Sequence, residues 1–195
     1  MFRKGSRKAE EYFGSQHRFE HWYCDNMVYF ITARCRGKQH AFDNESCKAL
    51  FWDRFDHYTA KFGFVPFVTS LMSNHYHVLG YLREGKNLGP MMKGIHGSVA
   101  KLVNDQLAER LTPLWTDAGH QNYFDGCIRD EVQCRRAYRY VLTQCRRHGV
   151  CEFPEDYPHT RQRIGLERAV ARALEKKAFM MGVPYARYAR KKRGI

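Results

Sequence analysis

The 195 residues suit one domain with an appended element, and a hydrophobic fraction of 44% excludes a disordered chain. The formal charge is +13, from 33 Lys and Arg against 20 Asp and Glu, which favours a polyanionic partner such as nucleic acid. We expect no membrane partner, because the sequence contains no long apolar span.

The seven cysteines are odd in number and include no C-x-x-C pair. This pattern fits neither a disulfide framework nor a zinc ribbon, and no cysteine stands out as a nucleophile. The first residues, MFRKGSRKAEEYFG, lack the apolar segment of a secretory signal. We therefore expect reduced thiols and a cytoplasmic location.

Three strands and a helix are predicted in the first half of the chain, after a basic N-terminal arm over residues 1–20. β-branched and aromatic residues predict strands over 27–35 and 64–72. Between them, Asp43 or Asn44 can cap a helix that runs to about Phe62 and is closed by Gly63. The third strand, 75–82, is apolar on both faces and should lie at the centre of the sheet.

Three further helices are predicted in the second half. Apolar residues recur at three- and four-residue steps from Gly89 to Leu107, whereas 113–124 has the composition of a loop with room for a short strand. Asp130 and Gln133 form a capping box for a helix that should end at Gly149. A last helix, about 161–181, precedes a basic tail.

Two histidines interrupt the third strand within MSNHYHVLG. His75 and His77 are two residues apart, so they point to the same face of the sheet, and Tyr76 points to the other. Adjacent imidazoles can bind a divalent cation, but strand histidines are more often only hydrogen-bonded or solvated. The strand alone leaves both interpretations open.

The helix that begins at Asp130 adds two candidate site residues. Tyr140 and Gln144 are four apart and share one helix face, whereas Tyr138 is rotated away and should pack in the core. An amide oxygen can complete a shell for Mg²⁺ or Mn²⁺ beside imidazoles, and the tyrosine would stand over the metal. Taken singly, Tyr140 could be a half-buried aromatic residue and Gln144 a solvated polar one.

These segments resemble a known family. MSNHYHVLG is similar to the histidine-hydrophobic-histidine (HUH) motif of single-tyrosine transposases. YFDGCIRDE, RRAYRYVLTQCRRHGV and FPEDYP resemble the following segments of the REP-associated tyrosine transposases. The resemblance spans about residues 22–160, and the domain boundaries that it suggests are 21–158 for the catalytic domain and 159–195 for a C-terminal helix and basic tail.

The resemblance implies a role for each candidate residue. His75 and His77 would bind Mg²⁺ or Mn²⁺, Tyr140 would be the nucleophile, and Gln144 would be the third, amide ligand. At the position of Gln144, REP-associated members typically carry Asn followed by Pro. A Gln at this position resembles the related insertion-sequence transposases instead. The subgroup is therefore open, although an amide ligand is retained.

The implied reaction is cleavage and rejoining of single-stranded or hairpin DNA through a 5′-phosphotyrosine intermediate. Such a transfer conserves the phosphodiester energy, and a bound metal would polarise the phosphate. No general base can be chosen from the sequence among His57, His96, His120 and His148. Basic residues expected to contact DNA phosphates, unless they are only a solvated helix face, are Arg135, Arg136, Arg139, Arg146, Arg147, Lys191, Lys192 and Arg193.

The predicted fold class is α+β, with a small central antiparallel sheet of HUH (ferredoxin-like) type, helices packed mainly on one face, and a C-terminal helical extension. Two other functions stay open: a domesticated protein that binds nucleic acid without cutting it, and a nuclease in which metal-activated water attacks. Both a monomer and a homodimer are compatible with the resemblance, and the C-terminal extension favours a monomer.

Overall fold

A computed structural model describes residues 23–115 and 122–180 of the chain. Within this part, five strands form an antiparallel sheet in the order β4-β1-β3-β2-β5. The strands are β1 (Met27–Arg34), β2 (Phe64–Leu71), β3 (His75–Leu82), β4 (Phe124–Cys127) and β5 (Thr160–Gln162). The predicted central position of β3 is confirmed.

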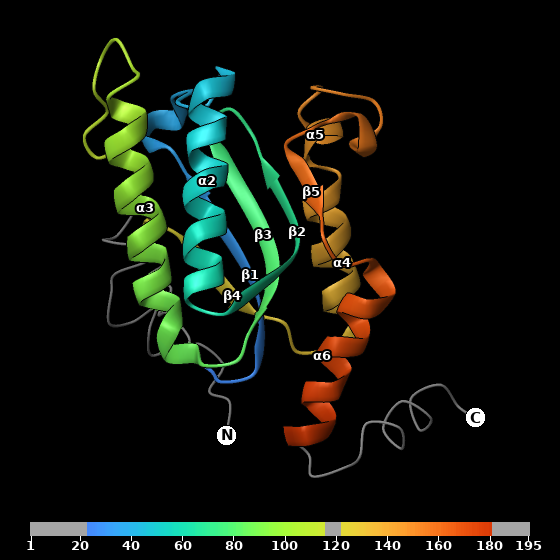
Figure 1. The fold of residues 1–195 in the computed structure, drawn as a ribbon. Helices are drawn as coiled ribbons and strands as arrows, with labels where there is room; N and C mark the ends of the chain where they lie inside the picture. Colours follow the sequence, from blue (N-terminus) through green and yellow to red (C-terminus); the bar gives the residue numbers. More distant parts are fainter. Residues whose placement is uncertain (1–22, 116–121, 181–195) are drawn as a thin grey trace, which may run out of the picture.

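Helices cover both faces of this sheet (Figure 1). On one face lie α2 (Glu45–Lys61) and α3 (Leu88–Asn104), and on the other lie α4 (Glu131–Leu142) and α6 (Leu166–Met180), with the short α5 (Gln144–Arg147) after α4. Three short 3-10 helices complete the described elements: η1 (Arg36–Lys38), η2 (Gly85–Asn87) and η3 (Pro154–Asp156). The α+β class is confirmed. The sequence predicted helices mainly on one face of the sheet, whereas the structure has helices on both faces.

Asn44, Gly63 and Asp130 lie at helix ends as the sequence predicted. The side chain of Asn44 accepts a hydrogen bond from the Cys47 amide at 2.7 Å, which starts α2. Gly63 follows α2 with φ +69°, a conformation that favours glycine. Asp130 accepts from the Gln133 amide at 2.8 Å and starts α4. These local signals fix where the helices sit against the sheet.

One large hydrophobic cluster packs on each face of the sheet, and a small third cluster contains Met72, Cys145 and Tyr157. Tyr76 and Val78 of β3 pack with the aromatic side chains of α2, whereas Leu79 packs with Tyr138 and Val141 of α4. Because successive strand residues alternate between faces, His75 and His77 lie on the α4 side. The packing of Tyr76 on the opposite side from the histidines agrees with the prediction.

Two parts of the second half differ from the sequence prediction. The helix from Asp130 does not run unbroken to Gly149, because α4 ends at Leu142 and α5 begins at Gln144. The segment after residue 159 begins with strand β5, which pairs with β2, and α6 starts only at Leu166. Three- and four-residue strands at a sheet edge carry too little periodicity to be recognised in a sequence.

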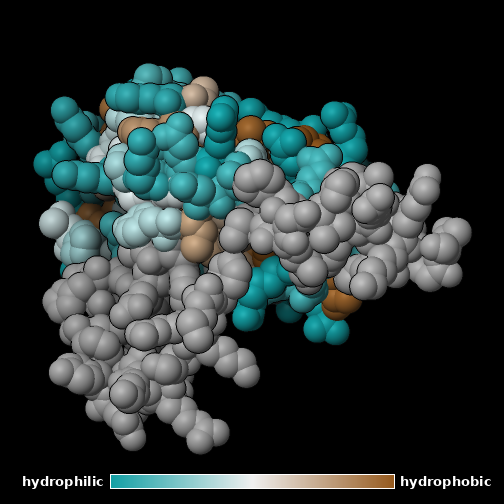
Figure 2. All heavy atoms as spheres, turned by 90° about the horizontal axis from the view of Figure 1, so that it is seen from below, coloured by the Kyte–Doolittle hydropathy of each residue, from teal (hydrophilic) through white to brown (hydrophobic). Residues whose placement is uncertain are grey.

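The surface of the described residues is largely hydrophilic in the view of Figure 2, with only scattered hydrophobic side chains. No helix in this described part is long and apolar enough to cross a membrane. The basic arm predicted over 1–20 and the tail after 180 lie outside the described residues.

Candidate active site beside the paired histidines

The two histidines of β3 lie side by side on the face that α4 covers. The ring centroids of His75 and His77 are 5.0 Å apart, and each residue is only 5% exposed. β3 holds them in place because it pairs on both sides, with β1 and with β2. They therefore form a preorganised pair under the α4–α5 segment.

Each imidazole is oriented by one neighbouring side chain through its Nδ1 atom. Nδ1 of His75 lies 2.6 Å from Oδ1 of Asn74, and Nδ1 of His77 lies 2.6 Å from Oγ1 of Thr32. Thr32 is the direct cross-strand partner of His77 in β1. Such outer contacts fix the orientation of the ring, as they do around metal-binding histidines. Sequence reasoning missed both partners, and Thr32 could be found only once the β1–β3 register was known.

Burial keeps both imidazoles neutral. The pKa of His75 is lowered to about 4 by loss of solvent and then by the charge of His148, against an opposing hydrogen bond with Gln144. The pKa of His77 is lowered to about 3, by loss of solvent and then by His75. At neutral pH both rings thus carry a lone pair, which is the form that can bind a metal ion.

Tyr140 of α4 stands next to this pair. Its ring centroid lies 5.0 Å from that of His77 and 5.8 Å from that of Phe30 in β1, both in edge-to-face contact. The guanidinium of Arg147 lies over the Tyr140 ring at 4.8 Å. These contacts hold the ring in place. The residue is only half-buried, so solvent or substrate can still reach it.

The neighbouring Tyr138 has a different environment, as the sequence spacing predicted. It is buried in the cluster between α4, α6 and the sheet, and its hydroxyl donates to the backbone oxygen of Ile164 at 2.8 Å. Tyr138 therefore packs in the core, and of the two tyrosines only Tyr140 lies beside the histidines.

Gln144 is brought to the site at the break between α4 and α5. Its Nε2 donates to the backbone oxygen of Tyr140 at 2.8 Å, and its side chain lies next to His75. With only 1% of its surface exposed, the carboxamide is fixed rather than solvated. Because its nitrogen is bound to Tyr140, the oxygen is the atom that can face the histidine pair. The structure thus brings together His75, His77, Tyr140 and Gln144.

One of the four histidines left open by the sequence borders this site. The ring of His148, which follows α5, is 4.9 Å from that of His75 and is exposed. His57 belongs to α2 and His96 to α3, on the opposite side of the sheet, and residue 120 lies outside the described part. The turn at Gly149, with φ +66°, follows His148 directly.

The predicted DNA-contacting arginines do not share one environment. Arg135 pairs with Glu131 at 3.0 Å and with Glu167 at 2.6 and 2.8 Å, which joins α4 to α6. Among the described residues, no carboxylate forms an ion pair with three exposed arginines: Arg136, Arg139 and Arg146. Lys191, Lys192 and Arg193 lie outside the described residues.

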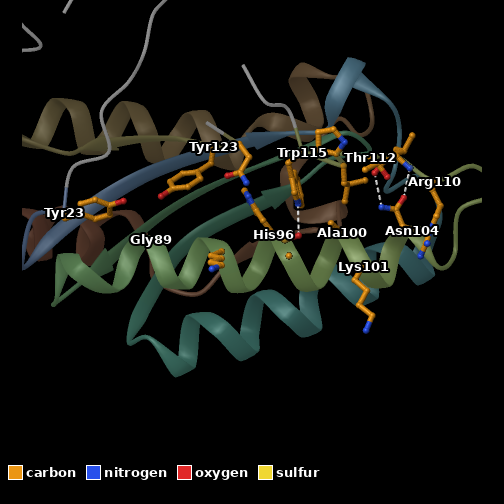
Figure 3. A pocket seen from close by; sticks show the side chains of 16 residues that line it. Tyr23, Gly89, His96, Ala100, Lys101, Asn104, Arg110, Thr112, Trp115 and Tyr123 are labelled. Carbon is orange, nitrogen blue, oxygen red and sulfur yellow. Dashed lines mark hydrogen bonds between the residues drawn. The ribbon is translucent and has the colours of Figure 1, made fainter. Parts of the chain in front are cut away.

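A separate hollow of about 740 Å³ lies on the other side of the sheet, along α3 (Figure 3). Lys93, Lys101 and Arg110 line it, so its charge is positive. His96 lines it, with its ring stacked on Trp115 at 4.3 Å, and Nε2 of His96 lies 2.9 Å from Oη of the buried Tyr76. Tyr76 thus connects the strand that carries the histidine pair to the lining of the hollow.

Comparison with known proteins gives a likeness in structure alone. No family model and no curated protein matches the sequence. Among solved structures, the chain is similar to a REP-associated tyrosine transposase bound to a REP hairpin, with a TM-score of 0.61 and 14% identity over 73% of this chain and 81% of that one. It is also similar to a protein from Deinococcus radiodurans R1 described as a transposase candidate, with a TM-score of 0.44 and 12% identity over 65% of this chain and 97% of that one. The part of the chain that the structure describes therefore has the fold of a REP-associated tyrosine transposase.

Proposed function

We propose that the chain belongs to the HUH single-tyrosine transposases, REP-associated or insertion-sequence-like, and is a metal-dependent endonuclease and strand transferase for single-stranded or hairpin DNA. The observation that carries this proposal is the position of Tyr140, whose ring lies 5.0 Å from that of His77. A shared fold alone hosts many functions, whereas a tyrosine beside two neutral histidines is a specific chemical arrangement.

The side chains around this site fit a divalent metal ion. In the described residues no three His, Cys, Asp or Glu side chains form a group that could hold a metal, so the donor set would be two imidazoles and the Gln144 amide oxygen. Both Nδ1 atoms are engaged by Asn74 and Thr32, which directs Nε2 of each ring to a ligand. Nitrogen and amide-oxygen donors together suit Mn²⁺ and are compatible with Mg²⁺. When bound, the metal would polarise the scissile phosphate and orient it.

Tyr140 would supply the nucleophile. Its phenolic oxygen attacks the phosphorus and loses its proton, a Tyr–O–P bond forms, and the bond from phosphorus to the 3′ oxygen breaks. The leaving 3′ oxygen takes up a proton, so one DNA end is a free 3′ hydroxyl and the other is a 5′ phosphate on the enzyme. A 3′ hydroxyl can later attack the same phosphorus and release the tyrosine.

The surroundings of Tyr140 support a nucleic acid as the substrate. Arg136, Arg139 and Arg146 are exposed around it on α4 and α5 and are not engaged by described carboxylates. Each can neutralise one phosphate. The REP hairpin bound by the transposase of similar fold supports hairpin DNA as the class to test first.

One chain contains the whole proposed set. His77 and Tyr140 meet within a single copy, and Nε2 of Gln144 donates to the backbone oxygen of Tyr140. We therefore propose that the tyrosine acts in cis and that a monomer is sufficient.

Two differently labelled copies of one DNA hairpin, incubated with the protein and Mn²⁺, test the proposal. We expect the 3′-labelled strand to become attached to the protein and the 5′-labelled fragment to be released with a 3′ hydroxyl. The Tyr140→Phe variant should form no adduct, whereas Tyr138→Phe, which changes the other tyrosine of α4, should still form it.

The same experiment separates the two other functions. Tight binding without cleavage in any divalent metal would favour a non-cleaving binding protein. Metal-dependent cleavage that leaves no adduct and persists in Tyr140→Phe would favour attack by activated water.

A further inference from the structure

A second hollow, of about 370 Å³, lies directly beside Tyr140, between α4 and the β1–β4 edge of the sheet. Its lining is mostly apolar and consists of Phe30, Phe124, Gly126, Ile128, Gln133, Arg136, Ala137 and Tyr140. Ligand pockets of a few hundred Å³ typically combine such an apolar lining with a small number of polar groups. The hollow thus has the size and character of a binding site for one flat group.

Aromatic rings connect this hollow to the candidate active site. The Phe30 ring stacks on His77 with centroids 5.8 Å apart and 12° between planes, and it meets Tyr140 edge-on at 5.8 Å. It also meets Phe124 of β4 at 6.4 Å. Tyr140 therefore borders both the candidate active site and the pocket, and Phe30 and Phe124 give the pocket aromatic walls.

The polar groups of the pocket are few and placed at one side. The Gln133 side-chain oxygen accepts a hydrogen bond from the Arg129 amide at 2.8 Å, so its NH₂ group is the part that can donate to a ligand. Arg136 is exposed, and its cation can meet a phosphate at the rim. An apolar slot with one amide donor and one cation matches a nucleobase joined to a phosphate.

We propose that this pocket receives the unstacked base of the nucleotide adjoining the scissile phosphate. The proposal rests on the proposed function, because it places that phosphate at Tyr140. A nucleotide joins its base to its phosphate through a single sugar, so a phosphate at the tyrosine hydroxyl brings one neighbouring base to the pocket. Enzymes that act on single strands commonly hold such a base between aromatic and apolar side chains.

Gly126 contributes to the space available. A Cβ atom at this position would lie 3.4 Å from the ring of Phe124, closer than most side-chain contacts. Ala137, on the α4 wall, likewise leaves volume that a longer side chain would fill. These two small residues keep the slot open between the strand and the helix.

Binding without metal tests the pocket independently of cleavage. The probe is a DNA hairpin with a single-stranded extension, prepared as a series in which each extension nucleotide in turn is abasic, and its affinity is measured in EDTA. For the wild type we expect one abasic position to weaken binding about 5- to 150-fold, the range for loss of one stacked base. In Ala137→Leu, which fills the pocket, intact and abasic probes should bind alike.

The control is Val132→Leu, which also introduces a leucine on α4 but at an exposed position outside the pocket. Ala137→Met, whose flexible side chain also fills the space, serves if the leucine variant is unstable. An unchanged preference for the intact base in both Ala137 variants, or no sensitive position in the wild type, would overturn the proposal. If the wild type discriminates the base but forms no Tyr140 adduct, the pocket proposal stands and the proposed cleavage is refuted. If it forms the adduct without discriminating the base, the cleavage proposal stands and the pocket proposal is refuted.

Discussion

Acid should destabilise the protein through His96, which lies on the far side of the sheet from the proposed active site. Its ring is 2% exposed and stacks on Trp115. Burial lowers its pKa to about 3. Burial also raises the pKa of Tyr76 well above its ordinary value, so the hydroxyl that lies 2.9 Å from Nε2 of His96 stays protonated. Adding a second proton to this buried ring is therefore unfavourable in the folded state.

The size of the effect follows from the difference between the folded and unfolded states. In the unfolded chain His96 titrates near 6.5, so between about pH 6.5 and pH 3 the unfolded state binds one proton more than the folded state. Stability from this residue is complete above pH 6.5 and is lost as the pH falls, by up to about 1.4 kcal/mol per pH unit. Between pH 7 and pH 5 the loss amounts to about 2 kcal/mol.

Urea unfolding of the wild type and of His96→Gln at both pH values isolates this contribution. Gln can still accept from Tyr76 but does not titrate, so the variant should lose about 2 kcal/mol less than the wild type on acidification. Equal losses in the two proteins would refute the reasoning. If the variant does not fold, an NMR titration of the wild-type His96 ring should show it unprotonated at pH 5, and a protonated ring would refute the burial argument equally.

The remaining predictions concern the active-site helices and the metal. Asp130→Ala removes the cap of α4 and should lower the free energy of unfolding by about 1 kcal/mol in urea titration; no change would mean that the cap is dispensable. Arg146→Gln should reduce the salt dependence of single-stranded DNA affinity by about 0.7 in the log–log slope, whereas Arg135→Gln, which breaks the α4–α6 ion pair, should leave that slope unchanged; the opposite order would contradict the placement of these residues. Mn²⁺ should raise the melting temperature of the wild type but not of His77→Ala, and an equal shift in both would place the ion elsewhere. A mixture of His77→Ala with Tyr140→Phe should stay inactive because the site is complete in one chain, and restored adduct formation would show action in trans.

The sequence predicts those features that depend on neighbouring residues. Asn44 and Asp130 cap the helices that they precede, because a cap is a contact over three residues. The apolar run from His75 to Leu82 predicts a central strand, and its alternation correctly separates Tyr76 from the two histidines. The pairing of Tyr140 rather than Tyr138 with the site also follows from local spacing on a helix.

Features made by contacts between distant segments were not predictable in the same way. Thr32 reaches His77 only because β1 and β3 pair in one particular register. α4 ends at Leu142 with Thr143 as its cap, and Gln144 then reaches the backbone oxygen of Tyr140 through its side chain. Arg135 has the same sequence signature as its neighbours, and only the position of Glu167 on α6 shows that it is engaged within the protein.

The covalent attachment site tests the central claim most directly. After reaction with hairpin DNA and Mn²⁺ and digestion with nuclease and trypsin, cleavage following the arginines separates the two tyrosines, since Tyr138 lies in Ala-Tyr-Arg (137–139) and Tyr140 in Tyr-Val-Leu-Thr-Gln-Cys-Arg (140–146). Mass spectrometry should find a nucleotide 5′ phosphate on the 140–146 peptide. Modification of the 137–139 peptide, or cleaved DNA with no modified tyrosine, would contradict the account.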